Sequence, residues 1–306
     1  MAKSREILSQ RQAIRNIRTA TKAMETVATT RLKKSQRWAA DAKPYTAGVA
    51  GLADDIIAPS DLSASRHPLL RAHGDLKRNV ILVLTSNRGL CGEYNSNVLR
   101  VALRRLGQLL QAGYSVPLHV VGKRGVDHLR ARGIEPDMQY TRFDDLADYH
   151  EVSRLAMDFS RAFIDGTISG LEVVYTEFIS SSRGGATVAT LLPLSPGRQA
   201  ARKLPASMQP PDHAAAPADE PTAYEFMPSG EGLLALLLPK MVRLRLFQCF
   251  LDAAAAEQLA RIVAMRAATD NADQMVHDLT LRYNRLRQRQ ITGQLAEILG
   301  GREGVR

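Results

Sequence analysis

The chain has few cysteines, few aromatic residues and no uninterrupted apolar run long enough to span a membrane. Its 306 residues include two cysteines, Cys91 and Cys249, and only 5% are aromatic. Two cysteines are too few for a disulfide framework, which fits a reducing compartment. The apolar stretch at 233–251 is broken by Pro239, Lys240 and two arginines, well short of the ~18–20 residues of a membrane helix. We therefore expect a soluble, helix-rich chain with no leader segment and no membrane span.

No catalytic or metal-binding pattern stands out either. The seven histidines have no metal-ligand spacing, and both G-x-x-x-x-G-K-[ST] and G-x-G-x-x-G are absent. The segment Ser86–Asn95 (SNRGLCGEYN) follows a predicted strand, where open α/β sheets often hold nucleotides. Without a phosphate-loop pattern, we favour a tight structural turn, and we interpret Cys91 as a buried thiol rather than a nucleophile. We expect no catalytic residue, no cofactor and no metal.

Positive charge is concentrated at the N-terminus. Residues 1–43 hold eleven lysines and arginines against three acidic residues, a net charge of +8 out of +10 for the whole chain. A basic helix indicates an acidic partner: nucleic acid, anionic lipid or an acidic protein surface. Base-reading proteins usually add a recognisable module or interleaved aromatic residues, and neither is present here.

Both ends of the chain predict long helices. Residues 233–300 read as one helix, and roughly 60 helical residues span about 90 Å, far more than a small domain can cover. The first fifty residues predict a second helix that runs on past Pro44, with a kink or break there, and ends by Pro59. Apolar residues three, four or seven apart predict a seam on each helix, so we expect an antiparallel coiled coil. The predicted seam residues are Ile7, Ile14, Ile17, Thr21, Met24 and Ala28 at the N-terminus, and Leu259, Ile262, Val263, Met265, Met275, Val276, Leu279, Tyr283, Leu286, Ile291 and Leu295 at the C-terminus.

The middle of the chain alternates strand and helix patterns. Strands are predicted at 79–84, 116–122, 171–178 and 186–194, with helices at about 96–112, 123–132 and 150–165. This alternation predicts a central open, mainly parallel, Rossmann-like α/β domain. We divide the chain into an N-terminal helix (1–58), an α/β domain (76–195), a proline- and alanine-rich loop (196–228) and a C-terminal helix (229–300), the two helices forming one unit.

Four segments carry a resemblance to a known family. They are Lys22–Ala28 (KAMETVA), Ser86–Asn95, Glu257–Ala272 (EQLARIVAMRAATDNA) and Tyr283–Ile298 (YNRLRQRQITGQLAEI). In this order and at these helix positions they resemble the gamma subunit of F-type ATP synthases, and the likeness covers nearly the whole chain. The sequence departs from the family pattern at five places: Thr26 replaces Met, Asn87 replaces Asp, Ala256 replaces Ser, Gln294 replaces Glu, and Met227 stands where an acidic residue precedes proline.

The resemblance implies a non-catalytic central rotor shaft. It would couple ion flow through a membrane ring of c subunits to ATP synthesis in a sleeve of alpha and beta subunits, and it would regulate ATPase activity. The implied partners are alpha, beta, epsilon and the c-ring, without nucleic acid. The implied place is peripheral, at the cytoplasmic face of a bacterial inner membrane. The implied beta-subunit contacts are Lys22, Met24, Arg261, Arg287, Gln288 and Thr292, and the implied ring contacts are Tyr224, Glu225 and Met227.

Two other classes of protein remain open at the level of sequence. A basic coiled-coil adaptor would bind polyanions with a steep salt dependence. A nucleotide-using enzyme built on the α/β domain would bind ATP as an isolated chain. Neither alternative needs the ordered motifs of the two terminal helices.

Overall fold

The structure is a computed structural model of the whole chain, and it describes residues 2–57, 67–74, 76–143, 148–180, 184–194 and 230–303. The two longest elements are α1 (Ala2–Ile57) and α6 (Gly230–Glu303). Contacts divide the chain into two compact units, each drawing on both helices: Met1–Thr29 with Arg261–Arg306, and Thr30–Ala260. We call them the helix-pair unit and the sheet unit and describe each by itself.

The sheet unit is built on five strands in the order β3-β2-β1-β4-β5. Strands β1 (Asn79–Leu84), β2 (Leu118–Val121), β3 (Met138–Tyr140) and β4 (Gly170–Phe178) run parallel, and β5 (Gly184–Leu192) pairs antiparallel with β4. Every residue of β1 is buried, as expected for a central parallel strand covered on both faces. The mainly parallel α/β sheet predicted from the sequence is thus confirmed.

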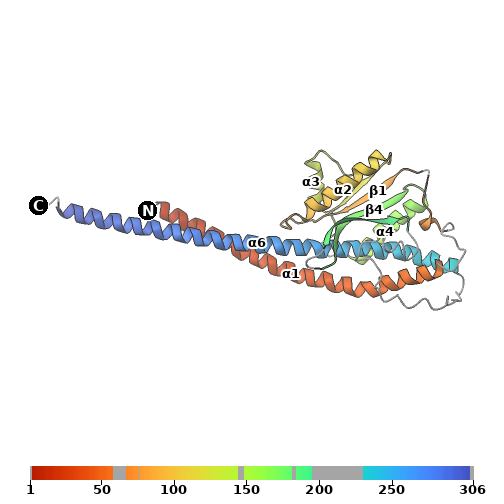
Figure 1. Cartoon of the computed structure of the whole chain (residues 1–306), viewed down its shortest axis with the longest axis horizontal. Helices are drawn as coiled ribbons and strands as arrows, with labels where there is room; N and C mark the ends of the chain where they lie inside the picture. The colour runs from red at the N-terminus through yellow and green to blue at the C-terminus, as the bar shows by residue number, and fades with distance from the viewer. Residues whose placement is uncertain are drawn as a thin grey trace. The chain divides into compact units, whose positions relative to one another are not determined.

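Helices cover both faces of the sheet (Figure 1). On one face, α2 (Tyr94–Gln111) and α3 (Lys123–Arg130) pack on alternate residues such as Ile81 and Val83. On the other face, Val80 and Leu82 join a core with α4 (Tyr149–Ile164), the 3-10 turn η1 (Pro68–Leu70) and the part of α6 that belongs to this unit. Successive side chains of β1 point to opposite faces of the sheet, so they contribute alternately to two separate cores.

An ion pair with a buried carboxylate holds α2 on the sheet. Arg105 of α2 donates two hydrogen bonds of 2.6 Å to the carboxylate of Glu172 on β4, and Asn79 of β1 donates a third of 3.1 Å. Glu172 is only 4% exposed. A buried carboxylate needs such partners, because leaving one uncompensated is strongly destabilising.

The helix-pair unit consists of α1 up to Thr29 and α6 from Arg261 onward, running antiparallel. The hydroxyl groups of Thr21 and Thr269 lie 2.7 Å apart in its interior, and Arg18 forms an ion pair with Asp273. Further along, the Arg11 guanidinium stands 5.7 Å from the ring centre of Tyr283. Residue numbers thus fall in one helix as they rise in the other, which confirms the antiparallel pairing.

The seam of this pair differs in part from the one predicted. Ile17 and Met24 of α1 are exposed, and so are Val263, Met275, Ile291 and Leu295 of α6. Thr21 and Ala28 are buried in the seam as predicted. Arg11 and Glu25, rather than their apolar neighbours, hold half-buried positions along it, and Arg18 stays exposed at its edge. Long charged side chains can fill such positions because their apolar stems pack while the charged ends find partners.

Both long helices pass through proline, and one short strand escaped prediction. Pro44 lies inside α1, which runs on past it as expected and is not broken there, and Pro239 lies inside α6. Each proline removes one backbone hydrogen bond, while the turns on either side keep theirs. Similarly α6 continues through Gly300 and Gly301 to Glu303. Strand β3, of three residues, has no run long enough to predict it. Within the described residues, no helix has the length and hydropathy to cross a bilayer.

Candidate functional site

The helix-pair unit exposes large apolar side chains along both helices. A helix pair in water would hide these residues in its seam and carry polar residues outside. Apolar groups left exposed in number mark a surface that another protein covers. The exposed apolar residues are Ile17, Met24 and Val27 of α1, and Val263, Met275, Leu281, Ile291 and Leu295 of α6.

Three of the predicted contact residues lie on this exposed surface of α6. Arg287, Gln288 and Thr292 are all exposed. Gln288, Ile291, Thr292 and Leu295 are three, four or seven residues apart, which places them on one face of the helix. Arg287 stands next to this face, so the polar groups border the apolar ones.

The other predicted contact residues lie elsewhere on the unit. Lys22 is exposed and forms an ion pair with Glu25 at 3.1 Å, and Met24 is 43% exposed. Arg261 is instead buried, at 9% exposure, so it is not presented as openly as the rest. Its burial follows from its place four residues before the seam residue Met265.

These residues form separate groups along the helix pair. Thr269 meets Thr21 in the seam, which sets the register near Lys22 and Met24. Arg287 follows Thr269 by eighteen residues, or about 27 Å of helix. The surface is therefore extended, with two groups of polar contacts rather than one compact site. The predicted ring contacts Tyr224, Glu225 and Met227, and the loop 196–228, lie outside the described residues.

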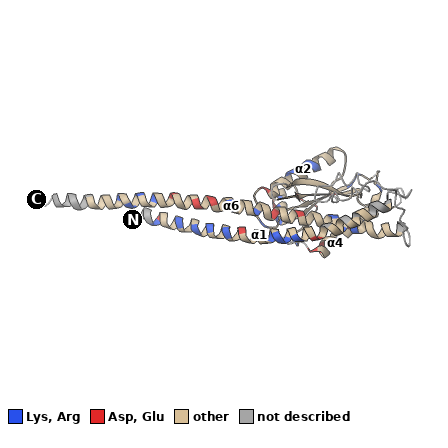
Figure 2. Ribbon diagram, turned by 60° about the horizontal axis from the view of Figure 1, so that its bottom comes forward, with Lys and Arg blue, Asp and Glu red and all other residues tan. Residues whose placement is uncertain are grey.

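Basic residues are prominent along α1 (Figure 2). Within the helix-pair unit Arg18 pairs with Asp273, while Arg15 and Lys22 project from exposed positions. Exposed cations next to exposed apolar groups are suited to a partner that offers both acidic and apolar side chains. Sequence reasoning missed Val27 and Leu281 as members of this surface. They could have been found as apolar residues that do not fall on the heptad positions of the seam.

The segment Ser86–Asn95 forms an internally hydrogen-bonded turn after β1. The Asn95 amide oxygen accepts a 3.0 Å bond from the Ser86 backbone N–H, and its nitrogen donates to Ser86 Oγ at 2.8 Å. Cys91 is buried, with Sγ 3.3 Å from Asn95 Nδ2. At the tip, Leu90 has a φ of +63° and is 60% exposed. The side chains of this turn hold its own shape, as the structural interpretation predicts.

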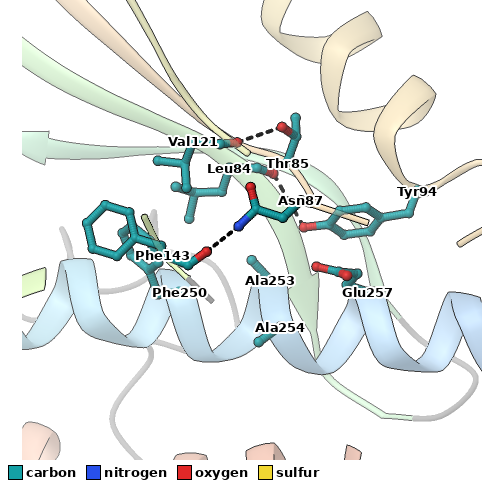
Figure 3. A pocket seen from close by; sticks show the side chains of 10 residues that line it. All are labelled: Leu84, Thr85, Asn87, Tyr94, Val121, Phe143, Phe250, Ala253, Ala254 and Glu257. Atoms are coloured by element: carbon teal, nitrogen blue, oxygen red, sulfur yellow. Dashed lines mark hydrogen bonds between the residues drawn. The ribbon is translucent and has the colours of Figure 1, made fainter. Parts of the chain in front are cut away.

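A small cavity lies at the carboxyl ends of β1 and β2 (Figure 3). It is lined by Leu84, Thr85, Asn87, Tyr94, Val121 and Phe143, and by Phe250, Ala253, Ala254 and Glu257 of α6. Its volume is about 40 Å³, room for one or two water molecules, whereas small-molecule pockets measure about 300–1,000 Å³. Thus α6 covers the place where an open α/β sheet would hold a nucleotide. Among the described residues, no cluster of histidine, cysteine or acidic side chains could hold a metal ion.

Comparison with known proteins gives a consistent result over the full length. The family model described as ATP synthase matches residues 3–305. The ATP synthase gamma chain of Rhodopirellula baltica is 41% identical, covering 100% of this chain and 99% of that one. The gamma chain of Saccharopolyspora erythraea is 34% identical, covering 100% and 98% respectively.

Solved structures agree at the level of the fold. The rotor of the Euglena gracilis mitochondrial ATP synthase matches with a TM-score of 0.61 at 13% identity, over 95% of this chain and 99% of that one. A second structure of the same enzyme, with its F1 part and c-ring, gives a TM-score of 0.65 at 14% identity, over 99% of this chain and 95% of that one. Together with the full-length sequence matches, these findings establish that the chain belongs to the ATP synthase gamma chain family.

Proposed function

We propose that this chain is the rotating central stalk of an F-type ATP synthase. Ion flow through a c-ring turns the chain, and the helix-pair unit, inside a sleeve of alpha and beta subunits, moves each beta subunit through states of different nucleotide affinity. Such a chain selects among conformations that the sleeve already populates, through contacts that differ between them. It supplies no catalytic residue, regulates ATPase activity, and contacts epsilon and the ring at the other end.

The observation that carries this proposal is the surface of the helix-pair unit. Its own seam holds the two helices together, yet large apolar side chains remain outside, from Ile17 on α1 to Leu295 on α6. A sleeve around the pair would cover them. The cavity of about 40 Å³ beneath α6 gives the competing enzyme hypothesis no comparable support.

The residues that transmit force are proposed by family position and exposure together. Arg287, Gln288 and Thr292 would meet a beta-subunit loop, and Lys22 and Met24 would face an acidic lever of beta. Arg261 would reach the sleeve from a largely buried position. The helices at 1–58 and 229–300 would act as the shaft, and the domain at 76–195 would sit peripherally on the cytoplasmic face of a bacterial inner membrane.

The test is a double substitution at the exposed polar group of α6. In the assembled complex, we expect Arg287→Ala with Gln288→Ala to lower the rate of ion-driven ATP synthesis several-fold while leaving subunit composition unchanged. A matched control is Gln274→Ala with Arg282→Ala, since these residues are also exposed on α6 but lie outside the family motif. Normal synthesis by the first variant would remove Arg287 and Gln288 from the mechanism.

A further inference from the structure

The side chain of Asn87, which departs from the aspartate of the family pattern, joins three parts of the sheet unit. Its Oδ1 accepts a 3.1 Å hydrogen bond from the backbone N–H of Lys123, the first residue of α3. Its Nδ2 donates to the carbonyl oxygen of Phe143 (Figure 3). The partners fix the orientation of the amide, because an N–H must meet the oxygen and a carbonyl must meet the nitrogen.

An aspartate at this position would keep only one of the two bonds. A carboxylate can accept from Lys123, but it has no hydrogen to donate and would place its charge against the carbonyl oxygen of Phe143. The cost would be a polar group left unpaired in a partly buried place. The amide is therefore matched to the segment that carries Phe143.

Phe143 is held between the turn after β1 and α6. It lies outside any helix or strand and is only 3% exposed. Its ring packs against Phe250 of α6 with 5.0 Å between ring centres, and the Arg142 guanidinium stands 5.5 Å from the ring centre. The path from Asn87 through Phe143 to Phe250 thus connects the turn after β1 with α6.

We propose that Asn87 is a positioning residue that holds Phe143, and through it α6, against the carboxyl edge of the sheet. The inference rests on the proposed function in one respect: a stalk that transmits torque needs its sheet unit to hold α6 firmly. In the assembled complex, loss of the Asn87 amide loosens that connection and lowers the ATP made per ion translocated. Catalysis itself stays in the sleeve.

The test compares Asn87→Asp and Asn87→Ala with the wild type, first in the full chain. Backbone amides at 247–257 are expected to exchange with solvent at least tenfold faster in both variants at pH 8. In Asn87→Asp alone, the difference shrinks as pH falls, because the protonated carboxyl regains a hydrogen to donate. The recovery follows protonation of this carboxyl, and the ordinary pKa of an aspartate is about 3.9.

The control is Asn97→Asp on α2. The Asn97 amide oxygen accepts from Arg100 at 2.8 Å, which a carboxylate does equally well, so exchange at 247–257 stays unchanged. Two results would overturn the proposal. One is wild-type amide exchange at 247–257 in Asn87→Asp at all pH values. The other is faster exchange in Asn87→Asp that does not depend on pH, as in Asn87→Ala.

Two further measurements keep the test decisive. If Asn87→Asp folds poorly, a double-mutant cycle of Asn87→Ala with Phe250→Leu replaces it; a combined loss smaller than the sum supports the connection, and strict additivity refutes it. In the assembled complex, Asn87→Asp should lower ATP made per ion translocated, whereas an unchanged ratio contradicts the coupling role. If the wild-type complex made no ATP, the proposed function would be wrong. The hydrogen-exchange measurement would still show whether Asn87 holds Phe143 and α6 in place.

Discussion

At the scale of residues, the seam of the helix pair is lined by charged as well as apolar side chains. The Arg11 guanidinium stands over the Tyr283 ring across the seam, and Arg18 pairs with Asp273 at its exposed edge. The apolar neighbour Ile17 faces outward and is 56% exposed. Hydrophobicity alone predicts that Ile17 lies in the seam, because it takes no account of the residues across the seam. Exposure of Ile17 and Met24 is thus the residue-level basis for a partner surface.

His119 of β2 gives the sheet unit a dependence on pH. Its ring lies 5.5 Å from that of Phe159, and its Nδ1 is 3.2 Å from the Tyr140 hydroxyl. Burial lowers the pKa of His119, with Arg78 also lowering it and Asp137 opposing. The folded state therefore resists a proton that the unfolded state takes up at about pH 6.5.

We expect stability to fall as pH drops from about 6.5 toward the lowered pKa of the folded state, because the unfolded chain binds more protons there. Urea unfolding at pH 7.5 and pH 5.5 measures this loss. His119→Leu should reduce the loss without removing it, since burial lowers the pKa of His67 as well. An identical pH dependence in the variant would show that His119 does not contribute.

At the scale of elements, the sequence predicted the strands and helices that have long, clean patterns. The run from Asn79 to Leu84 is buried over its whole length, and the two terminal helices form nearly to their predicted ends. Strand β3 was missed because its three residues carry no periodicity, and Met138 is 50% exposed at the sheet edge. The four family motifs indicated the candidate site, but they could not show that Arg261 is buried.

Two methionines of α6 separate the seam from the partner surface. Met265 is 4% exposed and Met275 is 53% exposed. Met265→Ala should therefore lower the free energy of unfolding of the full chain by about 2 kcal/mol or more, whereas Met275→Ala should change it by less than about 0.5 kcal/mol.

In the assembled complex we expect Met275→Ala to have the larger effect of the two substitutions, because it weakens attachment of the chain to the alpha and beta subunits. Denaturant unfolding of the chain and a binding titration with the sleeve give the two numbers. A strong loss of chain stability from Met275→Ala would place that residue in the seam and contradict the surface described above.

At the scale of the whole molecule, one chain supplies both a compact body and a long helix pair. The sheet unit is stabilised by two hydrophobic cores and by the ion pair between Arg105 and Glu172. The helix-pair unit has a narrow seam and an outer surface rich in apolar groups. A rotor needs a part that receives torque and a part that delivers it. The sequence indicated the long helices, but it did not show that each helix is shared between the two units, with Thr30–Ala260 forming the sheet unit.

The most direct test of the central claim is rotation of this chain against a fixed sleeve. Alpha and beta subunits are anchored to a surface, a marker is attached to an added cysteine at the exposed position Gln108 of α2, and ATP is supplied. We expect the marker to turn continuously in one direction while ATP is hydrolysed and to stop when ATP is withdrawn. Steady hydrolysis by an assembled complex whose marker stays still would contradict it.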